Sequence, residues 1–175
     1  MIDYGFPPIS ATSARVLILG SLPGQMSLRQ RQYYAQSRNV FWRIMGALFA
    51  MKPDLPYDAR IEQLIASNVA LWDVCASARR KGSLDSAIDP NSVTPNDFNA
   101  FFKMHRSIEL ICLNGKKAAA LYKRHVLPGL PKSKQQIRLE ELPSTSPAHA
   151  SMPYEQKIAR WLIVRTVAST EPARI

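Results

Sequence analysis

The sequence of 175 residues contains only two cysteines, Cys75 and Cys112. Two thiols are too few for a disulfide framework, for a cysteine-rich metal site or for an iron–sulfur cluster held by four cysteines. We therefore expect a protein of a reducing compartment, the cytoplasm. No apolar run approaches membrane-spanning length, and the amino-terminal residues show no signal-peptide pattern. The sequence thus predicts no membrane association.

Acidic residues are missing from two long stretches. None occurs between Asp3 and Asp54 or between Glu109 and Glu140, although arginines and lysines are frequent in both. The whole chain has 23 Lys and Arg against 13 Asp and Glu, a formal net charge of +10. Segments of one sign typically bind a polyanion, most often a nucleic acid. The alternative is a basic protein whose charges serve only solubility.

Short apolar runs alternate with segments of helical periodicity. The runs at 15–19, 68–73, 108–113 and 136–142 predict buried strands, and 40–50, 59–67, 116–124 and 153–167 predict helices. Thr94 is expected to start a further helix, and residues 75–83 to form a polar basic loop. This alternation predicts a parallel sheet covered on both faces. The length favours a single domain over 1–175, with an irregular lead-in at 1–14 and a frayed tail at 169–175.

The carboxyl ends of parallel strands meet at one edge of a sheet, where open α/β folds bind their ligands. Three loops are expected there, at 20–39, 73–83 and 143–149. The first opens with a turn between Gly20 and Gly24, whose glycines allow the backbone to approach a ligand closely. An ordinary strand–loop–helix connection is the other interpretation of this turn.

Five motifs in the sequence point to a particular protein family: GSLPG followed by SL, YYAQSRNVFW, WDVCASARRKGSLDSAI, LNGKKAA and LPSTSPAHA. In this order they resemble the hypoxanthine-DNA (deoxyinosine) glycosylases, a branch of the uracil-DNA glycosylase superfamily. The resemblance covers most of the chain. It implies a three-layer α/β/α fold with a four-stranded parallel central sheet, and a monofunctional DNA repair enzyme that hydrolyses the N-glycosidic bond of deaminated bases, chiefly hypoxanthine. It also implies base flipping from double-stranded DNA. The three histidines, His105, His125 and His149, are scattered and neither cysteine lies in a metal-ligand spacing, so we expect no metal and no cofactor. We expect a monomer.

The resemblance assigns catalysis to Asn39, within YYAQSRNVFW. Most of the superfamily has Asp or Asn at the centre of the first motif, where this chain has Leu22, which cannot hold a water molecule. A neutral amide can orient the attacking water through its carbonyl oxygen. The alternative role for Asn39 is that of a helix N-cap before Val40-Phe41-Trp42.

The base pocket is expected to contain Tyr34 and Asp73. Tyr34 matches the family's stacking aromatic, with Tyr33 as the alternative, and a packing role is open for both. The Asp73 carboxylate can accept the N1–H of hypoxanthine, or it can cap the turn after its strand. Leu22 and Pro23 can offer main-chain groups to the base.

Further residues are expected to bind DNA around the flipped nucleotide. Hydroxyl groups at the start of the last motif suit phosphates, and the residues after them can fill the gap in the duplex: Ser144, Thr145, Ser146, Pro147, Ala148 and His149. Basic candidates for backbone contacts are Arg79, Arg80, Lys81, Lys116 and Lys117. Any one of these charges can equally be a solvated surface group.

Two other functions are compatible with the same residues. A uracil or mismatch-specific glycosylase would differ only in the shape of the pocket. A catalytically inactive DNA-binding module would be expected to lack Asn39 and the tyrosines, yet the chain has them. In a bacterium we expect the enzyme in the cytoplasm, associated with the nucleoid.

Overall fold

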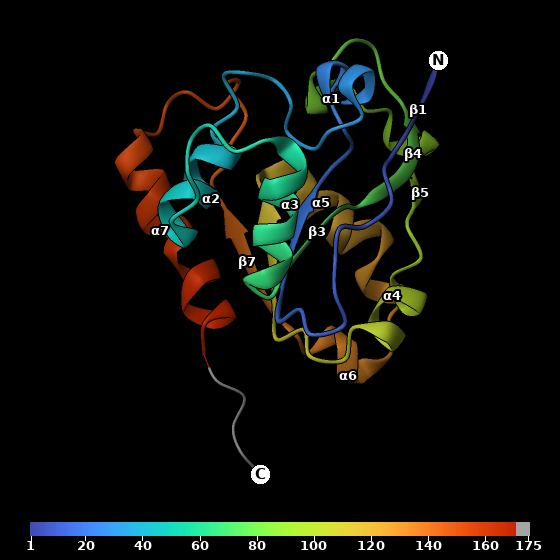
Figure 1. The fold of residues 1–175 in the computed structure, drawn as a ribbon. Helices are drawn as coiled ribbons and strands as arrows, with labels where there is room; N and C mark the ends of the chain where they lie inside the picture. Colours follow the sequence, from blue (N-terminus) through green and yellow to red (C-terminus); the bar gives the residue numbers. More distant parts are fainter. Residues whose placement is uncertain (171–175) are drawn as a thin grey trace.

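The computed structural model describes residues 1–170; residues 171–175 of the predicted tail lie outside the described part. The strands are β1 (Ile2–Tyr4), β2 (Val16–Gly20), β3 (Val69–Asp73), β4 (Cys75–Arg79), β5 (Thr94–Pro95), β6 (Leu110–Asn114) and β7 (Arg138–Leu142). The α-helices are α1 (Gln25–Gln30), α2 (Phe41–Phe49), α3 (Tyr57–Ala66), α4 (Phe98–Met104), α5 (Lys116–His125), α6 (Lys132–Gln135) and α7 (Tyr154–Ala168) (Figure 1). No helix within residues 1–170 is long and apolar enough to cross a bilayer.

A four-stranded parallel sheet forms the centre of the molecule, in the order β3-β2-β6-β7. Its strands are the four that the apolar runs predicted. β2, β3 and β6 are buried along their whole length, because helices cover both faces of the sheet. Leu17 of β2 lies opposite Ala70 of β3 on one side and Ile111 of β6 on the other.

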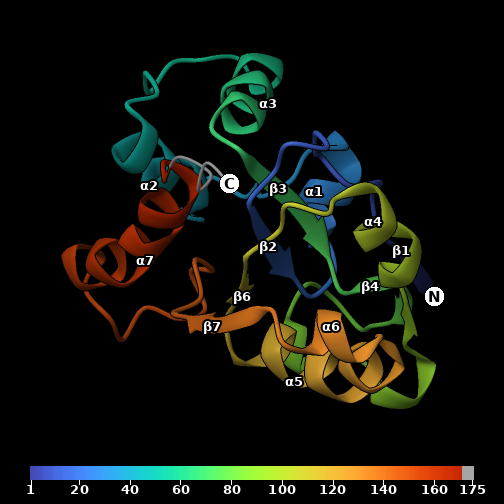
Figure 2. The ribbon, with the colours of Figure 1, turned by 90° about the horizontal axis from the view of Figure 1, so that it is seen from below.

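Two layers of helices cover the sheet, one on each face (Figure 2). Side chains alternate between the faces along β2: Val16 and Ile18 pack with α2, α3 and α7, whereas Leu17 and Leu19 pack with α4 and α5. Trp161 of α7 is fully buried in the first of these layers. The predicted three-layer α/β/α fold is therefore confirmed.

A small antiparallel sheet in the order β1-β4-β5 was not predicted. Residues 1–14 are not an irregular lead-in, because Ile2–Tyr4 pairs with β4 and Ile9 forms a bridge with Leu71. The expected polar loop at 75–83 begins instead as β4, whose edges are hydrogen-bonded on both sides. Thr94 lies in β5, and the helix that it was expected to start is capped by Asp97, whose side chain accepts a hydrogen bond from the Ala100 amide.

Candidate functional site

A cavity of about 720 Å³ opens at the carboxyl edge of the parallel sheet. Its volume falls within the roughly 300–1,000 Å³ usual for small-molecule sites. The predicted convergence of loops at this edge is correct, and the segment after β6 joins them. The lining comes from residues 20–27, 29, 33–34, 36, 38–39, 73, 83–86, 114–117 and 144–149.

Gly20, at the end of β2, has to be glycine because its neighbours leave no room for a side chain. A Cβ at this position would lie 2.4 Å from Oδ1 of Asp73 and 3.1 Å from the Tyr34 hydroxyl. Gly24 is different, since a Cβ there would meet no atom within 4 Å. Close backbone approach is thus required at Gly20, and it serves to bring Asp73 and Tyr34 together at the cavity wall.

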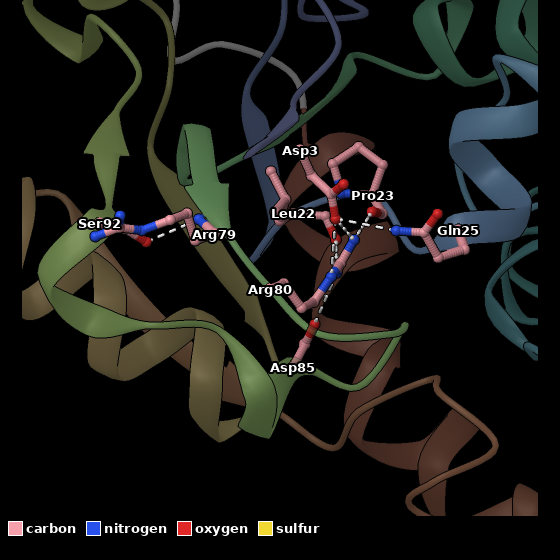
Figure 3. Close-up of polar contacts among 8 residues, drawn as sticks. All are labelled: Asp3, Leu22, Pro23, Gln25, Arg79, Arg80, Asp85 and Ser92. Atoms are coloured by element: carbon pink, nitrogen blue, oxygen red, sulfur yellow. Dashed lines mark hydrogen bonds and ion pairs between the residues drawn. The ribbon is translucent and has the colours of Figure 1, made fainter. Parts of the chain in front are cut away.

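Arg80 fixes the Leu22-Pro23 segment of this turn through hydrogen bonds to the main chain. The Arg80 guanidinium donates to the carbonyl oxygens of Leu22 and Pro23, and Figure 3 shows it pointing between them and Asp3. Each of these two carbonyls therefore has one lone pair engaged by Arg80, and the other stays compatible with a bond to a base. The side chain of Leu22 is 5% exposed and belongs to the core on the α4–α5 side of the sheet.

Tyr34 is fixed in an unusual backbone conformation. Its φ of 55° lies in the left-handed region, which a bulky residue rarely adopts. The ring stacks on Phe41 with 4.0 Å between centroids, and the hydroxyl accepts a hydrogen bond of 3.0 Å from Asn114 Nδ2. Burial, and then the charge of Asp73, raise the pKa of Tyr34, so its hydroxyl stays protonated. Tyr33 instead packs in the core at 3% exposure and donates to the carbonyl of Pro7.

Asn39 lines the cavity directly before α2. Its Oδ1 accepts a 2.9 Å hydrogen bond from the amide of Phe41, the first residue of α2, although the N-cap position itself is occupied by Val40. A carbonyl oxygen has two lone pairs, and the second is compatible with a bond to water. The bond to Phe41 and the orientation of a water molecule are therefore compatible, since this bond fixes the direction of the amide.

Asp73 ends β3, and the residue is 4% exposed. Within residues 1–170 its Oδ2 is buried without a hydrogen-bond partner, so the expected capping role is not seen there. Burial is the main cause that raises the pKa of this carboxyl to about 8; Asp85 raises it further and Arg80 lowers it. At neutral pH the group is therefore mostly protonated, unlike an ordinary aspartate.

Asn114, at the end of β6, was not predicted as a site residue. Its Nδ2 donates to Thr145 Oγ1 and its Oδ1 accepts from the Thr145 amide, each at 3.0 Å. Asn114 thus joins the loop at 144–149 to Tyr34, and the Thr145 carbonyl in turn accepts from the amide of Val40. Its place at the same sheet edge as Gly20 and Asp73 is the signal that would have revealed it.

The predicted phosphate ligands in this loop differ in accessibility. Thr145 is 1% exposed and its hydroxyl is bonded to Asn114, so the prediction that it contacts phosphate is corrected. Ser144 and Ser146 line the cavity, and their hydroxyl oxygens accept from the amides of Ser146 and Ala148. Pro147, Ala148 and His149 also line it. The buried ammonium of Lys157 holds the loop by donating to the His149 carbonyl at 2.7 Å.

The two neighbouring arginines of the third motif point in different directions (Figure 3). The side chain of Arg80 is 0% exposed and pairs with Asp3 at 2.8 Å, so the prediction that it contacts DNA is corrected. Arg79 is exposed and forms a 3.5 Å ion pair with Asp89. Lys81 is exposed too, while Lys116 and Lys117 line the cavity at the start of α5.

No group of three or more His, Cys, Asp or Glu side chains that could hold a metal ion occurs in residues 1–170. Cys75 and Cys112 are both buried as free thiols, and burial raises the pKa of Cys75 to about 12. The polar groups that line the cavity are amide, carboxyl, hydroxyl, ammonium, guanidinium and imidazole groups.

Two known proteins with related sequences are described as DNA glycosylases. The sequence pattern of the Uracil DNA glycosylase superfamily matches residues 7–167. The chain is 40% identical over 119 residues to a hypoxanthine DNA glycosylase of Methanosarcina acetivorans. The aligned region covers 67% of this chain and 74% of the relative. A hypoxanthine DNA glycosylase of Methanosarcina barkeri is 36% identical over the same share of both chains.

A solved structure agrees with this assignment. The solution NMR structure of a candidate uracil DNA glycosylase from Methanosarcina acetivorans superimposes with a TM-score of 0.79 at 33% identity. The match covers 95% of this chain and 99% of that one. The resemblance seen in the five sequence motifs is confirmed: the chain belongs to the uracil DNA glycosylase superfamily and is a DNA glycosylase.

Proposed function

We propose that this enzyme removes deaminated bases from double-stranded DNA, chiefly hypoxanthine, by hydrolysis of the N-glycosidic bond. The observation that supports this most is the cavity at the sheet edge, whose wall brings Asn39, Tyr34 and Asp73 together. The two relatives described as hypoxanthine DNA glycosylases support the choice of base. We further propose that the chain acts as a single domain and a monomer, in the cytoplasm at the nucleoid if the source is a bacterium.

The target nucleotide has to leave the duplex, because a base in the stack cannot be reached. In the proposed complex the flipped purine enters the cavity and lies against Tyr34, on the ring face that Phe41 does not occupy. The left-handed backbone conformation of Tyr34 and the hydrogen bond from Asn114 fix the orientation of this ring before the base binds. Leu22 supplies an apolar residue where many relatives have a polar one, which suits the larger purine.

Asn39 is proposed to orient the attacking water. Departure of a purine from deoxyribose has oxocarbenium-like character, so the water needs to be positioned more than deprotonated. The bond from the Phe41 amide to Asn39 Oδ1 fixes the amide plane, and the remaining lone pair faces the water. Most of the superfamily has Asp or Asn at the position of Leu22 for this task. In this chain that position offers no amide or carboxylate.

The DNA backbone is proposed to cross the mouth of the cavity. Ser144 and Ser146 lie on one side, and Lys116 and Lys117 come from the start of α5, where the positive end of the helix adds to their charge. Pro147, Ala148 and His149 would fill the gap left by the flipped nucleotide. Arg79 and Lys81 remain as exposed candidates for more distant phosphates.

The test is release of free base from a duplex oligonucleotide that contains one deoxyinosine, compared with the unmodified duplex. The wild-type enzyme should release hypoxanthine, and Asn39→Ala should lower the single-turnover rate by roughly 10²-fold or more while DNA affinity stays close to wild type. The wild type would only bind DNA if the chain were an inactive module. A mutant with wild-type turnover would remove Asn39 from the mechanism.

A further inference from the structure

The carboxyl group of Asp73 is placed in the wall of the cavity with little access to solvent. It packs against Gly20, where a Cβ would lie 2.4 Å from Oδ1, and the Tyr34 hydroxyl lies beside the same point. The residue is 4% exposed, and in the described residues Oδ2 has no hydrogen-bond partner. A buried carboxylate normally has paired oxygens, so this group is better suited to carry a proton than a charge.

Among residues 1–170, Arg80 is the one cation whose charge acts on the Asp73 carboxyl. The Arg80 guanidinium is already paired with Asp3 and bonded to two carbonyls (Figure 3). Asp85 lies 3.9 Å from the same guanidinium and adds a second negative charge. The other titratable groups around Asp73 are Tyr33, Tyr34 and Cys75, all neutral at pH 7, and Lys117, whose charge acts on Asp85 and Cys75.

We propose that Asp73 is the general acid of the reaction and donates its proton to N7 of the purine as the base leaves. This inference rests on the proposed function and adds a second catalytic residue to it. A buried, protonated carboxyl beside the base can supply a proton that a carboxylate accepting N1–H cannot. N7 of hypoxanthine carries a lone pair, and it lies in the same ring as N9, which receives the electrons of the broken bond.

The proposed step balances as follows. The C1′–N9 bond breaks and its electron pair passes to the base, while the Asp73 proton is transferred to N7, so hypoxanthine leaves as a neutral molecule. The water oriented by Asn39 adds to C1′ of the oxocarbenium ion and loses one proton to solvent. The Asp73 carboxylate then takes up a proton from solvent and returns to its resting state. One water is consumed, and the products are free hypoxanthine and an abasic deoxyribose.

This role distinguishes purines from pyrimidines. Uracil has no N7, so it gains nothing from an acid placed to protonate that atom. General acid catalysis typically contributes about 10²–10⁴-fold. Asp73 would therefore favour hypoxanthine over uracil through the chemical step, in addition to any effect of pocket shape.

The experiment compares the wild type with Asp73→Asn on deoxyinosine and on 7-deaza-2′-deoxyinosine, in otherwise identical duplexes under single-turnover conditions. Asn is isosteric and can donate a hydrogen bond, but it cannot transfer a proton. We expect the substitution to lower the rate on deoxyinosine by about 10²-fold. On the 7-deaza substrate, which has no N7 lone pair, wild type and mutant should release base at equally slow rates.

The pH profile gives an independent readout. With deoxyinosine the wild-type rate should be flat below about pH 8, where the pKa of Asp73 lies, and fall as the carboxyl ionises. In Asp73→Asn the fall in rate that is caused by Asp73 should be absent. Any fall that remains in this variant is caused by ionisation of the substrate, so the variant also serves as the control for it. In Asp85→Asn it should move to lower pH, because Asp85 raises the pKa of Asp73.

Two results would overturn the inference. One is an equal loss of rate on both substrates in Asp73→Asn, which would show that the residue acts on the pocket or on another edge of the base. The other is a pH profile of Asp73→Asn that superimposes on that of the wild type. If the wild type releases no hypoxanthine from the deoxyinosine duplex, the proposed function fails as well, so the two failures are distinguishable.

Discussion

Asn114 and Thr145 form two hydrogen bonds with one another, and each is 3.0 Å long. One joins the two side chains, and the other joins the Thr145 amide to Asn114 Oδ1. Since Asn114 Nδ2 also donates to the Tyr34 hydroxyl, a single amide fixes two of the loops that line the cavity. The shape of the site therefore depends on a residue proposed to contact neither the base nor the phosphates.

Asn114→Ala should destabilise the protein and slow base release. It leaves the buried Thr145 amide without a partner, which costs about 1–3 kcal/mol, and it frees Tyr34 and the loop at 144–149 to move. Thr145→Val is the matched control, because it removes only the hydroxyl and keeps the bond from the amide to Asn114. Urea unfolding and single-turnover rates measure both effects. Equal stability and activity in the two variants would contradict the role given to Asn114.

Arg79 and Lys81 together should account for part of the salt dependence of DNA binding. Each lost phosphate contact lowers the slope of log affinity against log salt by about 1, so Arg79→Ala with Lys81→Ala should make the slope shallower. The control is Lys103→Ala with Arg106→Ala, which removes the same charge near the amino edge of the sheet, before β6. A slope that changes equally in both double variants would show that the effect is only one of net charge.

Arg80 should matter for folding. Arg80→Ala leaves the buried carboxylate of Asp3 without its partner, and breaking a buried pair in this way typically costs about 3–5 kcal/mol. Asp3→Ala should be destabilising too, and the double variant should lose clearly less than the sum of the single losses. Denaturant unfolding of the three variants gives this comparison. Additive losses would mean that the two side chains do not depend on one another.

The stability of the protein should fall with rising pH because of Asp73. The pKa of its carboxyl is 3.8 when unperturbed and about 8 in the folded protein. The folded state therefore holds a proton that the unfolded state has lost between these values, and the stabilisation is complete below pH 3.8 and gone above pH 8. The difference in unfolding free energy between Asp73→Asn and wild type should thus grow in favour of the mutant from pH 4 to pH 8. A difference that stays constant with pH would contradict the raised pKa.

Much of the fold follows from local patterns in the sequence. β2, β3 and β6 are continuous apolar runs that end at turn-forming residues, so their existence and their parallel arrangement could be predicted. Because the carboxyl ends of parallel strands meet at one edge of a sheet, the sequence also predicted that Gly20, Asp73 and the loop at 143–149 lie together there. α1 and the sheet of β1, β4 and β5 could not be predicted in this way, because Cys75–Arg79 has no apolar alternation and pairs with residues more than 70 positions away.

The errors at the site have the same physical origin. Arg80 has the same sequence context as its neighbours Arg79 and Lys81, but it pairs with Asp3, which lies on β1 beside β4. Thr145 was predicted to bind phosphate, but both its hydroxyl and its amide are hydrogen-bonded to Asn114. The unpaired carboxyl of Asp73 likewise depends on which partner Arg80 takes. Each of these outcomes is decided by contacts between distant segments, which periodicity and motif spacing do not report.

The most direct test of the account is the ratio of single-turnover rates for hypoxanthine and uracil, measured on matched duplexes that differ only in the damaged base. Leu22 in place of a polar residue, a cavity of about 720 Å³ and the carboxyl of Asp73 in its wall all favour the purine. We predict that hypoxanthine is released clearly faster than uracil, whichever base lies opposite. Release of uracil at a similar or higher rate would contradict the deoxyinosine assignment and support a uracil glycosylase in its place.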